Sequence, residues 1–483
     1  MTGNMTPEEF RRYGRMVVDW VADYWEGIEK HPVLSQVAPG DVAGRLPARA
    51  PEQGEPFEAM FADLDRTVLP GITHWQHPSF FGYFPTNTSG PSVLADLAAG
   101  GLGVQGMLWA TSPACTEIET VALDWLRDLL GLPDRFSAAG AGGGVIQDTA
   151  SSATLVATLT ALHRASGGCW NADGLVDRYA VYASTEAHSS VQKAARIAGL
   201  GDGSVRLVDV DPRTLAMRPD RLRELIGTDR AAGVVPALVV ATIGTTSTTA
   251  IDPVPAIADC CADEGIWLHV DAAYAGSAAV CPELRWTHTG VDRADSYCFN
   301  PHKWLLVGFD CDAFWVADRA ELIQALSVLP EYLRNAATES GAVIDYRDWQ
   351  VQLGRRFRAL KLWWVMRWYG AEGLRAHIRR HVAWAQDFAG WVQADGRFEV
   401  AAPHPFGLVC FRLRARDGER EDAADERNAT LLRRLNESGA LYLTHTKING
   451  RYTLRFALGA PTTERRHVEA AWQQITTEAD RLD

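Results

Sequence analysis

Apolar and polar positions along the chain follow two different periods, and these periods predict which segments are helices and which are strands. From about residue 90 to 370, helical stretches such as EIETVALDWLRDLLG and SATLVATLTALHRAS alternate with short, strongly apolar runs. Those runs are RYAVYAS, ALVVATIG, IWLHVDAAY and AFWVAD. Helices alternating with buried strands are typical of a mostly parallel sheet covered by helices. Ligands bind such sheets in crevices at the carboxyl ends of the strands.

The two ends of the chain carry other patterns. Thr6-Pro7-Glu8-Glu9 is a capping box with proline at the first helical position, and apolar residues follow it at helical spacing up to Tyr24. We therefore expect an amphipathic first helix whose aromatic face packs on its own domain or across a partner subunit. After a long helical region at 355–393, strands and helices follow in succession. We expect three parts: an N-terminal helical segment at 1–85, a large domain at 86–375 and a small α+β domain at 376–483.

Composition and charge narrow the class of protein. The 483 residues are too many for one hydrophobic core, and 47% hydrophobic with 22% charged residues is ordinary for a globular protein. A net charge of −13 without a basic stripe argues against a nucleic acid partner. The longest apolar stretches, such as VVPALVVATIG, are too short to span a membrane and no secretory signal is visible, so we expect a cytoplasmic protein. The eight cysteines are scattered without metal-ligand spacing, so we expect reduced thiols and no metal site.

A glycine-rich stretch, AGAGGGVIQDTASSATLVATL, leads through Thr149 and Ala150 into a predicted helix. Backbone N–H groups and hydroxyls at a helix N-terminus form an anion site that suits a phosphate. The alternative is a flexible loop that ends in an ordinary helix cap. A dinucleotide fingerprint is disfavoured, because its last glycine would fall at position 145, which is Val145, and no strand runs directly into the glycines.

Polar residues also follow or end three further apolar runs. His188 lies just past RYAVYAS, Thr246 follows ALVVATIG, and Asp271 ends the strand in IWLHVDAAY. Lys303 stands in NPHKWLLVG beside an apolar run, where an ammonium is costly to bury. Each residue alone has a simpler explanation: a structural histidine, a turn-forming threonine or a salt-bridged lysine. Together an amine, a carboxylate, an aromatic ring and an anion site are what pyridoxal phosphate requires.

The chain resembles the group II pyridoxal-phosphate decarboxylases, and most closely the aromatic-L-amino-acid decarboxylases. The matching segments run in order along nearly the whole chain: HPSFFGYFPTNTS, LWATSPACTEIETVALDWL, GGGVIQDTASSATLVA, AHSSVQKAARIAG, ATIGTTS, HVDAAYAG, NPHKW, DYRDWQVQLGRRFRALKLWWVMRWYG and YTLRFALG. The resemblance implies the fold type I architecture of pyridoxal-phosphate enzymes, similar to that of aspartate aminotransferase. It implies a homodimer with the active site at the interface, the N-terminal segment packing across the dimer and residues 86–375 holding the cofactor.

The resemblance also implies a role for each residue that matches a family motif. Lys303 would form the Schiff base with the cofactor, and Asp271 would keep its pyridine nitrogen protonated. His188 would stack on the ring, and Tyr332, in SVLPEYLRNAATESGAVIDYRDWQ, would protonate the Cα carbanion after decarboxylation. The expected cofactor contacts are Ala150, Ser151, His188, Thr246, Asp271, Ala273, Asn300, His302 and Lys303.

For the substrate side chain, the resemblance implies a mostly apolar and aromatic pocket, which favours an aromatic ring over glutamate. Its expected members are Trp75, Tyr83, Phe84, Pro85, Thr86 and His188, with Gly354 under the ring and Gln105 and Met107 contributed by the partner subunit. Plant relatives with glycine at the position of Gly354 tend toward indoles, so tryptophan or 5-hydroxytryptophan is favoured, with dopa, tyrosine and phenylalanine as further possibilities.

Three other functions are weighed against decarboxylation of an aromatic amino acid. One is an aromatic aldehyde synthase, which decarboxylates and deaminates with oxygen; such enzymes typically carry phenylalanine in place of Tyr332 or lack the active-site histidine, whereas this chain has both residues. Another is decarboxylation of a non-aromatic amino acid. The last is a cofactor-free homodimeric interaction protein on the same scaffold, which is hard to reconcile with the joint presence of Lys303, Asp271, His188 and Tyr332.

Overall fold

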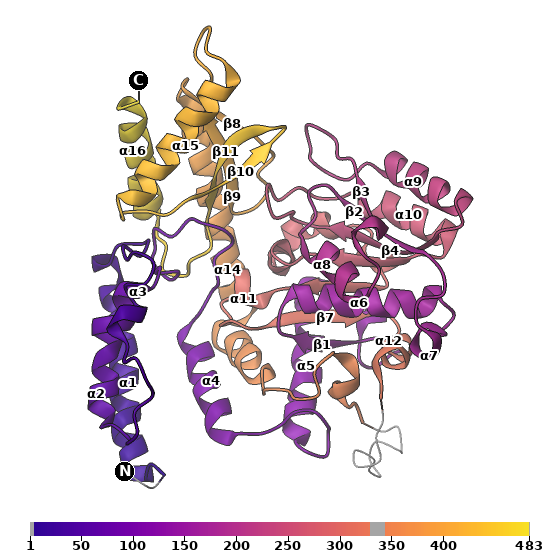
Figure 1. The fold of residues 1–483 in the computed structure, drawn as a ribbon, viewed down its shortest axis with the longest axis horizontal. Helices are drawn as coiled ribbons and strands as arrows, with labels where there is room; N and C mark the ends of the chain where they lie inside the picture. Colours follow the sequence, from indigo (N-terminus) through magenta and orange to yellow (C-terminus); the bar gives the residue numbers. More distant parts are fainter. Residues whose placement is uncertain (1–3, 329–342, 483) are drawn as a thin grey trace.

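The structure is a computed structural model that describes residues 4–328 and 343–482. Figure 1 shows a large domain around a central sheet, a smaller C-terminal domain beside it, and a helical N-terminal segment that extends away from both. No helix in these two ranges is long and apolar enough to cross a membrane.

The described strands of the large domain form one seven-stranded sheet in the order β1-β7-β6-β5-β4-β2-β3. Neighbours from β3 to β6 are parallel, whereas β7 runs antiparallel to both β6 and β1. The sheet is therefore mostly parallel, which confirms the predicted fold class. The strands are β1 (Gly143–Gln147), β2 (Tyr179–Ser184), β3 (Val205–Val208), β4 (Val235–Thr242), β5 (Trp267–Asp271), β6 (Ser296–Phe299) and β7 (Asp312–Val316).

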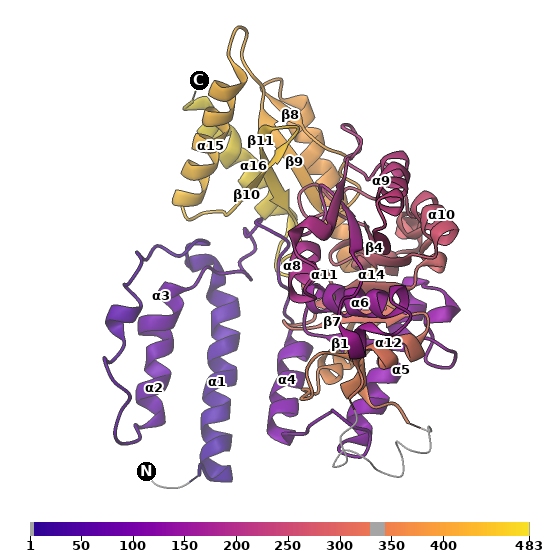
Figure 2. The same cartoon turned by 45° about the vertical axis from the view of Figure 1, so that its right-hand side comes forward.

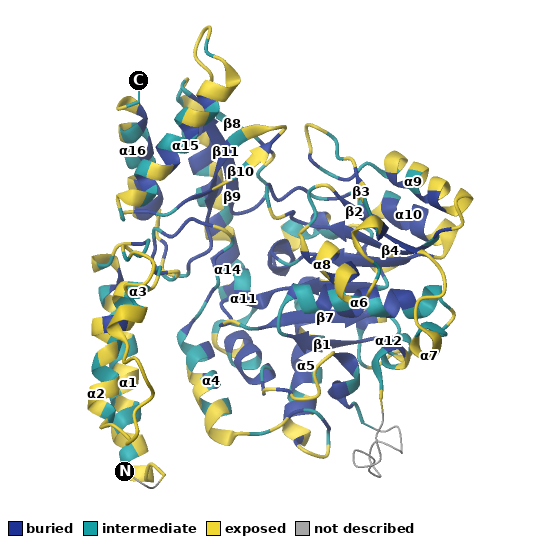
Figure 3. Cartoon of the chain, viewed as in Figure 1, coloured by how far each residue is buried: buried dark blue, intermediate teal, exposed yellow. Residues whose placement is uncertain are grey.

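Helices cover both faces of this sheet, and Figure 3 shows its strands as the buried centre of the domain. One face packs on α6 (Ala150–Ala165), beside which lie α8 (Ser190–Ile197) and α12 (Arg319–Leu326). The other face packs on α5 (Pro113–Leu130), α9 (Pro219–Ala231) and α10 (Val254–Glu264), with α4 (Gly90–Leu102) and α14 (Ala359–Ala394) further out. Val239 and Val240 of β4 point to opposite faces and are both 0% exposed. Burial on both faces explains why the strands are continuous apolar runs rather than alternating ones.

The glycine-rich stretch differs from the expected loop. Its glycines begin strand β1, which pairs Gly143 with Val316 of β7, and only Asp148 and Thr149 separate β1 from α6. A Cβ at Gly142 would lie 2.0 Å from the carbonyl oxygen of Arg135 and 2.6 Å from that of Val316. The glycines therefore permit close backbone approach in a sheet rather than loop flexibility.

The C-terminal domain is an antiparallel sheet with helices on one face. Its described strands, in the order β10-β11-β9-β8, are β8 (Phe398–Val400), β9 (Leu408–Leu413), β10 (Thr444–Ile448) and β11 (Arg451–Ala457). Helices α15 (Glu421–Glu437) and α16 (Arg465–Asp480) and the end of α14 pack on it. Helix α14 has a non-helical residue at Gly370 and continues across the predicted boundary at 375/376. Leu374 belongs to the core of the large domain and Ala385 to that of the small one, so one helix connects both cores.

The N-terminal segment contains α1 (Pro7–Gly27), α2 (Phe57–Asp63) and α3 (Leu69–Gly71). The capping box at Thr6 and Glu9 is present, as expected. Figure 2 shows α1 and α2 side by side and separate from the main body of the chain. The Tyr13 ring of α1 stacks on Phe57 of α2 at 4.2 Å, yet no residue of α1 is buried. The segment therefore leaves most of its surface uncovered in the single chain.

Candidate active site

A cavity of about 220 Å³ lies where strands β4, β5 and β6 end. It is formed by the polar residues that follow these strands and by the first turn of α6, as the polar strand ends predict. The structure brings together in its wall all nine residues expected to contact the cofactor: Ala150, Ser151, His188, Thr246, Asp271, Ala273, Asn300, His302 and Lys303.

Lys303 reaches this cavity from the single-turn helix α11 (Pro301–Trp304), which begins directly after β6. The Lys303 N–H donates to the Asn300 carbonyl oxygen at 2.9 Å, which fixes the turn. The Lys303 ammonium forms no hydrogen bond or ion pair with another described residue, and it lies over the Phe84 ring, 5.7 Å from the ring centroid. Removal from water lowers the pKa of Lys303, and the Asp271 charge only partly opposes this effect. An amine in this setting is available as a nucleophile.

Asp271 is the last residue of β5 and is 4% exposed. Its Oδ1 accepts the backbone N–H of Ala273 at 2.9 Å, which orients the carboxylate at the end of the strand. The side chain lines the cavity, so the other oxygen remains available to a bound group. A buried carboxylate is stabilised best by a cation, and a protonated ring nitrogen would provide one.

His188 lies between β2 and α8 at the mouth of the cavity, where the single chain leaves it exposed. Its Nδ1 accepts the N–H of Ser190 at 3.1 Å, so in the neutral ring the proton is on Nε2. Partial removal from water lowers the pKa of His188, while the Asp271 carboxylate acts in the opposite direction. A neutral, flat ring held at this position can stack on a planar ligand.

The N-terminus of α6 offers an anion site on the same cavity wall. Its first N–H, from Ala150, donates to Asn300 Oδ1 at 3.2 Å, and the Ser151 side chain is next to it. His302 Nδ1 accepts the Cys311 N–H at 3.0 Å, and burial, assisted by the Lys303 charge, lowers the pKa of His302 to about 3. Because His302 is neutral, the site attracts an anion through N–H groups and the helix dipole.

These features fit pyridoxal phosphate on this structure's own geometry. Among the described residues, the amine in this cavity has no partner and one oxygen of the carboxylate is free. An exposed imidazole face and the N-terminus of α6, a helix of 16 residues, complete the set. Lys303 would bind the aldehyde carbon, Asp271 the ring nitrogen, and α6 with Ser151 the phosphate. Among the described residues, no cluster of histidine, cysteine and carboxylate side chains could hold a metal ion.

Three residues next to the cavity were missed from the sequence. Tyr274, 1% exposed, stacks on Phe84 with ring centroids 3.8 Å apart. Arg455 comes from β11 of the small domain, and its guanidinium lies 5.2 Å from the Phe84 ring centroid. Arg455 donates to the carbonyl oxygens of Thr246 and Ser247 at 2.8 and 2.9 Å, so the small domain holds the loop that carries Thr246. Phe309, 61% exposed, completes the outer wall.

The expected substrate residues divide into two groups. Phe84 lines the cavity, whereas Trp75 and Tyr83 stack on each other at 5.5 Å outside it, and Pro85 and Thr86 lie next along the chain. Gln105, Met107 and Gly354 lie away from the cavity of their own chain but close to one another. The Gln105 side chain accepts the Arg355 N–H, and the Met107 carbonyl oxygen accepts the Arg347 N–H at 3.1 Å. Tyr332 lies outside the described residues.

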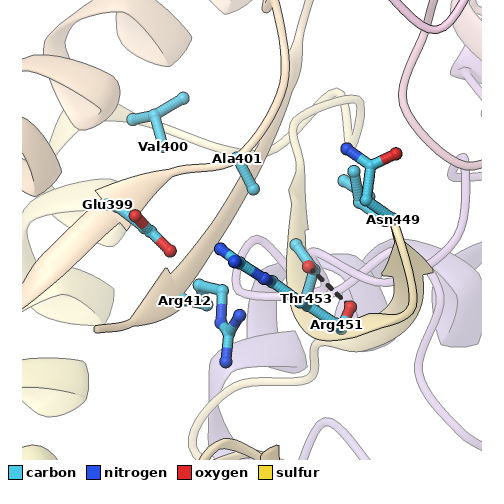
Figure 4. A pocket seen from close by; sticks show the side chains of 8 residues that line it. Glu399, Val400, Ala401, Arg412, Asn449, Arg451 and Thr453 are labelled. Carbon is cyan, nitrogen blue, oxygen red and sulfur yellow. Dashed lines mark hydrogen bonds between the residues drawn. The ribbon is translucent and has the colours of Figure 1, made fainter. Parts of the chain in front are cut away.

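A second cavity, of about 350 Å³, lies on the small domain between β8, β9 and the β10–β11 turn (Figure 4). Two guanidinium groups, of Arg412 and Arg451, line it. Both face carboxylates: Arg412 lies 3.2 Å from Glu421 and 3.1 Å from Asp425, and Arg451 lies 3.6 Å from Glu421. The cations are therefore already paired, and no ligand is assigned to this cavity.

Comparisons with known proteins agree with the fold and with pyridoxal phosphate as the cofactor. Residues 39–414 match the family model described as the pyridoxal-dependent decarboxylase conserved domain. The chain is 46% identical to phenylacetaldehyde synthase of Arabidopsis thaliana, over 99% of this chain and 97% of that protein. It is 45% identical to aromatic-L-amino-acid decarboxylase of Mus musculus, over 98% of each. The crystal structure of Oryza sativa TDC with PLP and tryptamine superposes with a TM-score of 0.96 at 43% identity, over 100% of both chains.

Proposed function

The chain belongs to the pyridoxal-dependent decarboxylases, a family of pyridoxal-phosphate carboxy-lyases, and from this premise we propose that it converts an aromatic L-amino acid to the arylalkylamine and CO2. Its cofactor is pyridoxal phosphate. The observation that carries the proposal is that one cavity holds both the Asp271 carboxylate and the Lys303 amine, which has no hydrogen-bond or ion-pair partner among the described residues.

Each of several side chains of the cavity would have a separate role in the reaction. When bound, pyridoxal phosphate supplies an electron sink for the pair left on Cα when the carboxylate departs as CO2. Lys303 Nζ would hold the cofactor covalently until the substrate amine takes its place. Asp271 would keep a proton on the ring nitrogen, and His188 would cover the ring and orient the substrate. We propose that Tyr332, which lies outside the described residues, delivers a proton to Cα.

An aromatic substrate is supported by the charge and shape of the cavity wall. Among its described lining residues, Lys303 is the sole lysine and no arginine is present, and Phe84, Tyr274 and Phe309 provide aromatic surface. A second carboxylate on the substrate, as in glutamate, would lack a guanidinium partner there. We infer that the substrate side chain is an aromatic ring, with tryptophan or 5-hydroxytryptophan favoured, since tryptamine is bound in the similar rice structure.

We also propose that the active unit is a homodimer. Gln105, Met107 and Gly354 lie together but away from the cavity of their own chain, which fits their expected contribution to the partner's site. Helix α1 has no buried residue in the single chain, so its surface is available to form an interface with a partner subunit.

The product assay tests the proposed reaction directly. The protein, purified with pyridoxal phosphate, is incubated in air with tryptophan, 5-hydroxytryptophan, tyrosine, dopa or phenylalanine. We expect amine and CO2 in equal amounts from at least one indole amino acid, with little hydrogen peroxide. No amine from any of the five would refute the proposal.

A second function, aromatic aldehyde synthesis, is favoured by the 46% identity to phenylacetaldehyde synthase. The same assay separates the two, because an aldehyde synthase releases aldehyde, ammonia and peroxide in place of amine. Retention of both His188 and Tyr332 supports the amine-forming reaction.

Substitution of Gly354 by serine tests the indole preference. A Cβ at Gly354 would lie 3.3 Å from Gln105 Nε2, so serine narrows the space that these two residues would offer to a ring. We expect the ratio of kcat/KM for tryptophan over dopa to fall by about tenfold, the usual effect of one small group in a substrate pocket. Competition assays measure the ratio. Gly396→Ser is the matched control, because a Cβ there meets nothing within 4 Å. An unchanged ratio in Gly354→Ser would exclude Gly354 from the substrate site.

A further inference from the structure

Asp312, the first residue of β7, has a carboxyl group that the reaction as described above does not use. The residue is 0% exposed, and neither carboxyl oxygen has a hydrogen-bond partner in the described part of the chain. An isolated buried carboxylate is so costly that such a group is either neutral or paired with a cation. Burial accordingly raises the pKa of Asp312 well above its ordinary value.

The direction of β7 places this carboxyl close to Lys303. Because β7 is antiparallel to β6, its first residue lies at the edge where β6 ends, one step beyond the last ladder pair, Phe299 with Ala313. Asp312 is therefore opposite Asn300, whose carbonyl oxygen accepts the Lys303 N–H at 2.9 Å. Asp312 also points to the sheet face that α6 covers, as its ladder neighbour Gln147 does.

The charges of the two groups act on each other. A charged Lys303 lowers the pKa of Asp312, and a charged Asp312 raises the pKa of Lys303. Asp271 and Asp148 oppose ionisation of Asp312 by like charge. The other titratable groups beside Asp312 are thiols and a phenol that burial keeps neutral: Cys298, Cys311 and Tyr297. Lys303 is therefore the cation that can stabilise an ionised Asp312.

The cluster holds two carboxyl groups and one amine, and Asp271 is already committed to the cofactor's ring nitrogen under the proposed function, on which this inference rests. We propose that Asp312 is a positioning residue for Lys303: it is a neutral acid while the Lys303 nitrogen is neutral and ionises when that nitrogen gains a proton. One proton is gained at Nζ and one is lost from the Asp312 carboxyl. The pair is thus neutral overall in both states.

The first test is spectroscopic and uses the cofactor-loaded protein. The visible absorption band of the bound cofactor is titrated with pH in the wild type and in Asp312→Asn, which keeps the shape of the side chain without its charge. Without the negative charge of Asp312, the protonated Lys303 nitrogen is less stable. The midpoint of the pH titration of the visible band should therefore fall by about one pH unit. A packing role alone would leave the midpoint unchanged, and an unchanged midpoint would overturn the proposal.

The second test uses the cofactor-free protein and needs no assumption about the reaction. Thermal stability is measured against pH for Asp312→Asn, Lys303→Met and the double variant. In Asp312→Asn, Lys303 has a folded-state pKa below its unfolded value near ~10.4, so stability should be lost as pH falls from that value. In Lys303→Met, Asp312 has a folded-state pKa above its unfolded value near ~3.9, so stability should be lost as pH rises from that value. The two single variants should therefore have pH slopes of opposite sign.

The wild type and the double variant should both lack these slopes, because in each the folded and unfolded states bind the same number of protons at this pair. Asp252→Asn provides the control. Asp252 is another buried acid, whose pKa burial raises to about 6, but it accepts the N–H groups of Met217 and Thr242 and does not act on Lys303. The effect of Asp252→Asn on thermal stability should add to that of Lys303→Met. If the two single variants had slopes of the same sign, or if the double variant kept either slope, the assignment of these charges to Asp312 and Lys303 would be wrong. Absence of any visible band would refute the proposed function while leaving this second test valid.

Discussion

Replacing Lys303 by alanine is expected to lower kcat for amine formation by at least about 10³-fold, which corresponds to about 4 kcal/mol of activation free energy. Under the proposed function the Lys303 amine is the nucleophile of the cavity, and within residues 4–328 and 343–482 it has no hydrogen-bond or ion-pair partner whose loss could explain the effect. The purified variant should also fail to retain the borohydride-reducible visible band of the wild type. Steady-state kinetics and absorption spectra measure the two effects.

Lys361→Met is the matched control for this variant. Lys361 is the buried lysine of the same domain that does have a partner, Asp96, at 3.2 Å. Its loss should lower the melting temperature while leaving the visible band in place. If Lys303→Ala kept a reducible band and wild-type kcat, Lys303 would not be the cofactor-binding residue.

The second large effect is expected for Asp271→Asn. The neutral amide removes the charge opposite the cofactor's ring nitrogen, and an ion pair at about 4 Å with an effective dielectric constant of ~20 is worth about 4 kcal/mol. We expect kcat to fall by about 10³-fold. Because Lys303 is intact, the variant should still bind the cofactor covalently, so the visible band should persist with an altered pH dependence.

Asp252→Asn again serves as the comparison, because it removes a buried acid of the same sheet edge that does not line the cavity. The Asp252→Asn substitution should have a larger effect on the stability of the fold than on kcat. A wild-type kcat in Asp271→Asn would show that ring protonation does not depend on this carboxylate.

The part of the site that follows parallel strands was accessible from the sequence. Asp271, Thr246 and Asn300 each lie at or just past the end of an apolar run, and parallel strands bring their carboxyl ends to one edge. The local sequence pattern was sufficient to predict these positions, because the strand, the turn and the polar residue are contiguous in each segment. Lys303, Asp271, His188 and the anion site together then indicated the cofactor, and the family motifs around them indicated the family.

Asp312 could not be found in this way. It begins a strand rather than ending one, and only the antiparallel direction of β7 brings it to the cavity edge. Strand direction is set by connections and pairing across the whole sheet, so it cannot be predicted from the residues AFWVAD alone. The motif HVDAAYAG contains Tyr274, but its contact with Phe84 depends on a segment far away in the sequence.

The same limit applies to the glycines at 142–144. A run of glycines is ambiguous between a flexible loop and a close-packed strand, because both use the missing Cβ. The decision depends on whether a neighbouring backbone lies within contact distance, and here the carbonyl oxygen of Val316 does.

Arg455 has a consequence for the evolution and engineering of this enzyme. Its guanidinium, supplied by β11, binds the carbonyl oxygens of Thr246 and Ser247, in a loop of the large domain from which Thr246 lines the cavity. The small domain is therefore not an interchangeable module. A chimera that joins this large domain to the C-terminal half of a relative would inherit a correctly positioned Thr246 loop only if the donor supplied an arginine in the same register of its sheet.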